Sequence, residues 1–164
     1  MRELSVDDVI QVKLGSRGLL VIGGPPGANR ALLAAAVPGA TLITPNQTWE
    51  NTLHWAPSLL RYPLARVKHW LRIVKNALTV GGPIVLREPA TRQITRTALR
   101  RLAWVSGRDL HLIWVDSATD EPRGRRLWLA RRMLVGGATP PGWQSARVIS
   151  RAKVRDGLTL RVTA

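Results

Sequence analysis

The residues best suited to chemistry lie in "GGPPGANRA" (23–31), which follows the apolar run "GLLVI" (18–22) and precedes the helix-forming run "LLAAAV" (32–37). A glycine-rich turn between a strand and a helix directs backbone N–H groups and the positive helix end toward an anion. The pattern therefore predicts a phosphate- or anion-binding loop that contains Gly24, Gly27, Ala28, Asn29 and Arg30.

The three residues Asn29-Arg30-Ala31 stand where a nucleotide site normally has Gly-Lys-Ser/Thr. The planar guanidinium of Arg30 is a poor substitute for a compact ammonium in a tight loop, and Ala31 has no group that holds a metal ion. Loss of two contacts of roughly 1.5–3 kcal/mol each weakens binding by about 10²–10⁴-fold. We therefore expect a nucleotide such as ATP to bind weakly at best, without Mg²⁺, and we assign no cofactor.

The charge balance favours a polyanionic partner. The chain has 25 Lys and Arg against 10 Asp and Glu, which gives a formal net charge of +15. A positive field of this size favours nucleic acid or an acidic protein surface as the partner. The densest group of arginines lies in 121–137 and comprises Arg123, Arg125, Arg126, Arg131 and Arg132.

Other function classes find little support in the sequence. There is no cysteine, and the three histidines lack the spacing of a metal site, so no metal site is predicted. No apolar run is long enough to span a bilayer, and the first residues have no apolar signal-peptide core. We expect a cytoplasmic protein that has no membrane partner.

Short apolar runs alternate with segments of helix length. Strands are predicted over 9–14, 18–24, 38–45, 83–89 and 109–116, and helices over 28–37, from Pro63 to Gly81, over 94–105 and over 121–137. This alternation predicts an α/β fold whose mostly parallel sheet has helices on both faces. We expect one domain over 1–164, with a leading segment over 1–17 and a C-terminal β-hairpin over 146–163 that turns at Asp156-Gly157.

Two of the predicted helices are amphipathic. The first has an apolar stripe at steps of three and four, formed by Leu64, Val67, Leu71, Val74 and Leu78. Its other side carries Arg66, Lys68, Arg72 and Lys75. The second has the stripe Ile94, Ala98, Leu102 and Val105, with arginines around it at 92, 96, 100 and 101.

The order of these elements, with a motif at each strand end, resembles the P-loop kinase-like proteins over about 18–151. The resemblance is to the polynucleotide-kinase and zeta-toxin-like branch of this AAA-type group. The segment from Gly24 to Ala28 matches the opening half of the Walker A loop, and the arginines of 121–137 match the lid helix. The resemblance implies a catalytic Asp after the second strand and a carboxylate after the third. This chain has Asn46 and Arg87 there, with Glu88 next to Arg87.

Three functions are compatible with this pattern. The preferred one is a catalytically degenerate P-loop kinase-like domain that binds nucleic acid or an acidic protein, with the arginines of 92–101 and 123–132, Arg30 and Arg87 around one groove. The second is a divergent nucleotide or polynucleotide kinase that uses Arg30 for the lysine and Glu88 as a surrogate carboxylate. The third is an assembly subunit in which the seven tryptophans and the amphipathic helices make the contacts.

Overall fold

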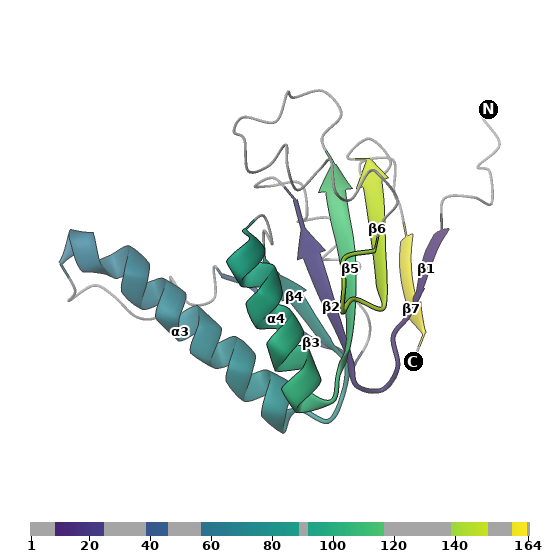
Figure 1. Ribbon diagram of the computed structural model, residues 1–164, viewed down its shortest axis with the longest axis horizontal. Helices are drawn as coiled ribbons and strands as arrows, with labels where there is room; N and C mark the ends of the chain where they lie inside the picture. Colours follow the sequence, from purple (N-terminus) through teal and green to yellow (C-terminus); the bar gives the residue numbers. More distant parts are fainter. Residues whose placement is uncertain are drawn as a thin grey trace.

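The centre of the molecule is a parallel β-sheet of five strands in the order β3-β4-β2-β5-β6 (Figure 1). The structure is a computed structural model and describes residues 9–24, 39–45, 57–88, 92–116, 139–150 and 159–163. The strands are β2 (Gly18–Gly23), β3 (Thr41–Ile43), β4 (Ile84–Arg87), β5 (Asp109–Asp116) and β6 (Ser145–Ser150). Every neighbouring pair in this sheet is parallel, which confirms the α/β fold predicted from the sequence.

The central strands are buried on both faces, as is typical of a parallel sheet. Leu19 of β2 lies opposite Ile84 of β4 and Leu110 of β5, and all three are at most 2% exposed. Their neighbours Leu20 and Val85, which point to the opposite face, are also fully buried. This pattern explains why the strands are continuous apolar runs in the sequence.

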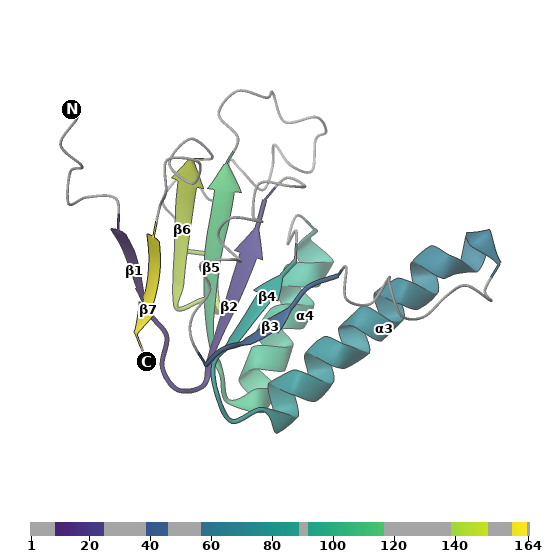
Figure 2. The same cartoon turned by 180° about the vertical axis from the view of Figure 1, so that it is seen from behind.

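Two described helices, α3 (Ser58–Thr79) and α4 (Gln93–Ser106), cover the same face of the sheet (Figures 1 and 2). Ile73 of α3 and Leu99 and Ala103 of α4 belong to one buried cluster with side chains of β2, β4 and β5. The predicted helices over 28–37 and 121–137 lie outside the described residues. The described helices cover one face of the sheet, and helices on the other face stay a prediction.

The two helices end where the sequence predicted, but α3 begins earlier. α3 starts at Ser58, and Pro63 lies inside it rather than in its first turn. Its C-terminus is capped by the buried side chain of Arg108, which donates hydrogen bonds to the carbonyl oxygens of Ala77 (2.8 Å), Gly82 (2.9 Å) and Val80. α4 ends at Gly107, whose φ of +61° closes the helix in the left-handed conformation.

The face of α3 that contacts the sheet is not the apolar stripe. The buried positions follow a four-residue step and are Ala65, His69, Ile73 and Ala77. Leu71 lies two positions from Ile73, roughly 200° around the helix, and is 64% exposed. The small alanine side chains allow close approach to the sheet, while the larger leucines and valines of the stripe point away from it.

The predicted C-terminal hairpin is wrong, although its two strands exist. β6 pairs in parallel with β5, with Ser145 opposite His111. β7 (Thr159–Thr163) pairs in parallel with β1 (Val9–Lys13), in a separate two-stranded sheet on the β6 side of the molecule (Figure 1). β6 and β7 therefore each pair with a strand that is distant in the sequence and do not pair with each other. Asp156-Gly157, the predicted turn, lies outside the described residues.

Candidate functional site

The carboxyl ends of β2 and β5 form the first candidate site. The next strand after β2 is β3, at one edge of the sheet, and the next strand after β5 is β6, at the other edge. In open parallel sheets, ligands bind in a crevice at the carboxyl ends of two neighbouring strands from which the chain leaves in opposite directions. The predicted phosphate loop therefore begins at the position where such a fold places a ligand.

Gly24 begins that loop, and only glycine fits there. Its φ is +136°, and a Cβ atom would lie 2.6 Å from the carbonyl oxygen of Val115. The backbone thus passes directly over the end of β5. The other predicted loop residues, Gly27, Ala28, Asn29 and Arg30, lie outside the described residues.

Arg87 reaches the same edge of the sheet as Gly24. It is the last residue of β4, lies opposite Ile22 of β2 and is partly exposed. Because side chains alternate along a strand, Arg87 points to the face opposite Leu86 and the described helices. The structure therefore brings Gly24 and Arg87 to one edge. Asn46 and the five predicted lid arginines, Arg123, Arg125, Arg126, Arg131 and Arg132, lie outside the described residues.

Glu88 follows Arg87 and points to the helix-covered face, where it is 1% exposed. Its backbone N–H donates to the carbonyl oxygen of Ile22 at 3.3 Å, which continues the strand pairing by one residue. Its carboxylate accepts a hydrogen bond of 2.9 Å from Nη2 of Arg66, and its Oε2 lies 3.4 Å from Nε2 of His69. The carboxylate is thus held against α3 by Arg66, while Oε2 of Glu88 and both ring nitrogens of His69 are buried without a hydrogen-bond partner among the described residues.

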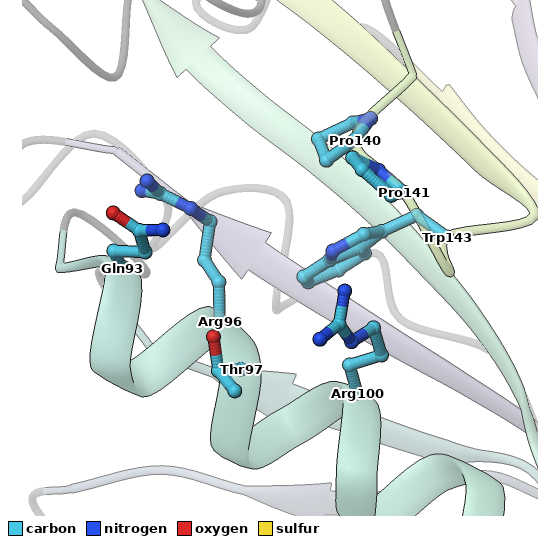
Figure 3. Close-up of a pocket in the computed structure, with 7 residues that line it drawn as sticks. All are labelled: Gln93, Arg96, Thr97, Arg100, Pro140, Pro141 and Trp143. Atoms are coloured by element: carbon cyan, nitrogen blue, oxygen red, sulfur yellow. The ribbon is translucent and has the colours of Figure 1, made fainter.

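A second candidate site lies between α4 and residues 139–144, which precede β6 (Figure 3). We call it the α4 groove, and its lining residues are Gln93, Arg96, Thr97, Arg100, Pro140, Pro141 and Trp143. Arg96 and Arg100 project from the helix side, and the two prolines and Trp143 form the opposite wall (Figure 3). Burial lowers the pKa of the Arg96 guanidinium, which remains cationic at neutral pH.

Arg100 is positioned by a glycine of the facing segment. Gly142 has a φ of +81°, and a Cβ atom there would lie 2.8 Å from Cγ of Arg100 and closer still to its Cδ. The arginine stem therefore lies against the bare backbone of Gly142. In Figure 3 the guanidinium of Arg100 points toward the ring of Trp143.

A neighbouring hollow continues the basic surface past Arg100. Its lining includes Arg101, Trp104, Arg108 and Gln144. Trp104 is 83% exposed, which places a large aromatic ring in water beside two exposed arginines, Arg100 and Arg101. Neither hollow has an Asp or Glu among its described lining residues. Cationic and aromatic groups without carboxylates favour binding of an anion that carries flat rings.

The α4 groove differs from the groove expected from the sequence. The arginines of 92–101 were expected at the strand ends beside Arg87, whereas Arg96 and Arg100 face residues 139–144 on the helix-covered face. The lining residues that were not predicted from the sequence as site residues are Gln93, Thr97, Pro140, Pro141, Trp143 and Trp104. The run "TPPGW" (139–143) is the signal that was available, because two prolines and a glycine mark a fixed turn beside an aromatic residue.

Across the part of the chain that the structure describes, no three His, Asp or Glu side chains are grouped to hold a metal ion. Neither described helix is long and apolar enough to span a membrane. No family model matches the chain, and no curated protein matches it either. The geometry of the two candidate sites is therefore the basis for the functional argument.

Proposed function

We propose that the protein is a non-catalytic binding domain for single-stranded nucleic acid, which lies along the α4 groove and over Trp104. The observation that carries this proposal is the exposed ring of Trp104 beside Arg100 and Arg101. The sequence predicted an anionic partner, either nucleic acid or an acidic protein surface. We favour nucleic acid, bound by a scaffold that resembles the P-loop kinases.

The chemistry of the surface matches the two parts of a nucleotide. Guanidinium groups neutralise backbone phosphates, and the indole ring offers a face on which an unpaired base stacks. Arg100 adds a cation along the α4 groove, and its stem lies against Gly142. A duplex hides the faces of its bases, so a stacking residue favours a single strand.

The state of Glu88 supports the absence of catalysis. A surrogate metal ligand or base needs an accessible carboxylate, but Glu88 is 1% exposed and its Oε1 accepts a hydrogen bond from Arg66. The described carboxyl edge includes Gly24, the cation Arg87 and the acidic residue Asp116 at the end of β5. Phosphoryl transfer needs metal and charge stabilisation with an oriented nucleophile, and among the described residues no three His, Asp or Glu side chains are grouped to hold a metal ion.

Fluorescence anisotropy with labelled oligonucleotides tests the proposal. The wild-type protein is expected to bind single-stranded DNA or RNA more tightly than duplex of equal length at physiological salt. Arg100→Ala/Arg101→Ala is expected to reduce the slope of log K against log salt by about 1.4, since each single-strand phosphate contact contributes about 0.7. Arg61→Ala/Lys75→Ala removes the same charge from α3 and serves as the matched control.

Two outcomes of this titration would overturn the proposal. One is an equal loss of affinity in the α3 control, which would mean that only net charge matters. The other is a preference for duplex. Calorimetry with MgATP separates the alternative kinase function, because micromolar Mg²⁺-dependent binding followed by turnover is expected of a kinase and not of a binding domain.

A further inference from the structure

α3 carries an exposed apolar surface that the proposed function does not use. Its members project from one side of the helix and are each between 36% and 64% exposed: Leu60, Leu64, Val67, Leu71, Val74 and Leu78. We call these six residues the α3 stripe. The stripe extends over most of a 22-residue helix, which is about 33 Å long.

The α3 stripe lies on the side of the helix that faces away from the sheet. The buried residues Ala65, His69, Ile73 and Ala77 hold the opposite side against the protein. In both ribbon views the N-terminal part of α3 extends beyond the sheet (Figures 1 and 2). Contiguous apolar side chains in water cost free energy, and such patches mark sites of interaction.

The charges of α3 define the kind of partner. The helix contains five Lys and Arg and no Asp or Glu. Four of these cations lie along one flank of the stripe, roughly 60–120° from its centre, and they are Arg61, Lys68, Arg72 and Lys75. A complementary partner therefore has an apolar row with carboxylates beside it. A second copy of α3 brings the same positive charges together and is disfavoured.

The shape of the other flank favours a helix over a lipid surface. A hollow runs along it from Tyr62 and Pro63 past Val67 and Trp70 to Val74. The ring of Trp70 is partly buried and packs against the core rather than projecting outward. Of the two aromatic residues beside the hollow, Tyr62 is 60% exposed and Trp70 is anchored in the core, and the apolar side chains between them can accept those of a partner helix.

We infer that α3 docks an acidic amphipathic helix of a partner protein. The apolar residues of that helix pack against the α3 stripe and into the adjacent hollow, and its Glu and Asp side chains pair with the Lys and Arg flank. Three to four heptads of helix match the length of α3. The binding surface is separate from the α4 groove, so a nucleic acid and a protein bind to different helices.

A designed peptide tests this inference with the full chain. The probe is a labelled 24-residue helix with leucines on one side and glutamates on the flanks, and a scrambled peptide of the same composition is its control. Micromolar affinity for the helical peptide and at least tenfold weaker affinity for the scrambled one are expected in anisotropy titrations.

Three double variants test which residues bind the peptide. Val67→Ser/Leu71→Ser is expected to weaken peptide binding at least tenfold, and because both side chains are exposed, the circular dichroism spectrum is expected to stay unchanged. Arg72→Gln/Lys75→Gln is expected to reduce the salt dependence of binding. Arg100→Ala/Arg101→Ala is expected to bind the peptide as the wild type does, while it loses affinity for oligonucleotides.

Other occupants of the stripe give distinct results. The inference is overturned if the scrambled peptide binds equally well, or if phosphatidylserine-containing vesicles bind the chain and the helical peptide does not. It is also overturned if light scattering shows a dimer that Val67→Ser/Leu71→Ser dissociates. None of these results affects the oligonucleotide titration, so failure here is distinguishable from failure of the proposed nucleic-acid site.

Discussion

Arg66 on α3 donates a hydrogen bond of 2.9 Å to Oε1 of Glu88, the residue that follows β4. The carboxylate is buried, whereas the arginine is partly exposed, and His69 lies one helical turn further along α3 against the other carboxylate oxygen. The contact fixes α3 to the carboxyl edge of the sheet. The contact gives Glu88, the carboxylate next to Arg87, a structural partner in α3.

Removal of this carboxylate is expected to destabilise the fold. Glu88→Ala removes the carboxylate partner of Arg66 and leaves a void beside the buried ring of His69, which costs about 2–3 kcal/mol of the free energy of unfolding. Urea denaturation measures the loss. Arg87→Ala, at the neighbouring partly exposed position, is expected to change stability by less than about 0.5 kcal/mol. Equal effects of the two substitutions would contradict the structural role of Glu88.

Gly24 is expected to be intolerant of any side chain. Gly24→Ala forces a positive φ on alanine and places Cβ 2.6 Å from the carbonyl oxygen of Val115, so a loss of at least about 1–3 kcal/mol is expected. Gly81→Ala is the matched control, because a Cβ atom there has no neighbour within 4 Å. Thermal unfolding distinguishes the two glycines, and a Gly24→Ala protein as stable as Gly81→Ala would refute the close approach.

The sheet was predictable because each strand is locally encoded. The apolar runs that contain Leu20 and Ile113 are buried on both faces, and a run of that kind identifies a central parallel strand without knowledge of its partners. Strand pairing is less local. The Asp156-Gly157 signal suggested a hairpin, but β7 pairs with β1 at the other end of the chain, and no short-range pattern encodes that choice.

The orientation of the helices was not predictable from their hydrophobic pattern. In α3 the more apolar side is in water, as Leu71 and Ile73 show, because small alanines and His69 make the contact with the sheet. The hydrophobic pattern identifies which side chains lie on the same side of a helix. It does not identify which side of the helix packs against the sheet. The same limit applies to the candidate sites. The α4 groove joins Arg100 to Trp143, which is 43 positions further along the sequence, and Glu88 contacts a helix that precedes it.

His111 is expected to make stability depend on pH. Burial lowers the pKa of its imidazole below the usual 6.5, although Asp109 raises it in part, and Nδ1 lies 2.8 Å from Oγ of Ser145. The unfolded chain therefore binds a proton at a higher pH than the folded one. The contribution is complete above about pH 6.5 and is lost as the pH falls from there toward the folded pKa, by at most about 1.4 kcal/mol per pH unit.

Urea unfolding at pH 7.5 and pH 5.5 measures this dependence. His111→Asn keeps a polar group near Ser145 but cannot take up the proton, so its stability is expected to fall less between the two pH values than that of the wild type. An equal fall in both proteins would show that other groups cause the pH dependence.

A substitution at Gly142 changes the shape of the α4 groove but not its charge, so it tests whether that shape affects binding. Gly142→Ala places a methyl group where the stem of Arg100 lies and is expected to displace the guanidinium from the groove. Affinity for a single-stranded oligonucleotide is expected to fall about three- to tenfold, as for weakening of one solvent-exposed contact by about 0.7–1.4 kcal/mol. The variant is measured by anisotropy, with its melting temperature as the control for folding. Unchanged affinity would mean that Arg100 acts only through general charge.

Photochemical cross-linking can locate a single-stranded nucleic acid on the α4 surface by the residues that it contacts. A single-stranded oligonucleotide with 5-iodouracil at several positions is bound at physiological salt, irradiated and digested with trypsin, and the modified peptides are identified by mass spectrometry. We expect the main adduct on Trp104, in the tryptic peptide 102–108, and we expect Trp104→Ala to abolish it. Adducts confined to peptides of α3, or a pattern that Trp104→Ala leaves unchanged, would show that nucleic acid does not bind on the α4 surface.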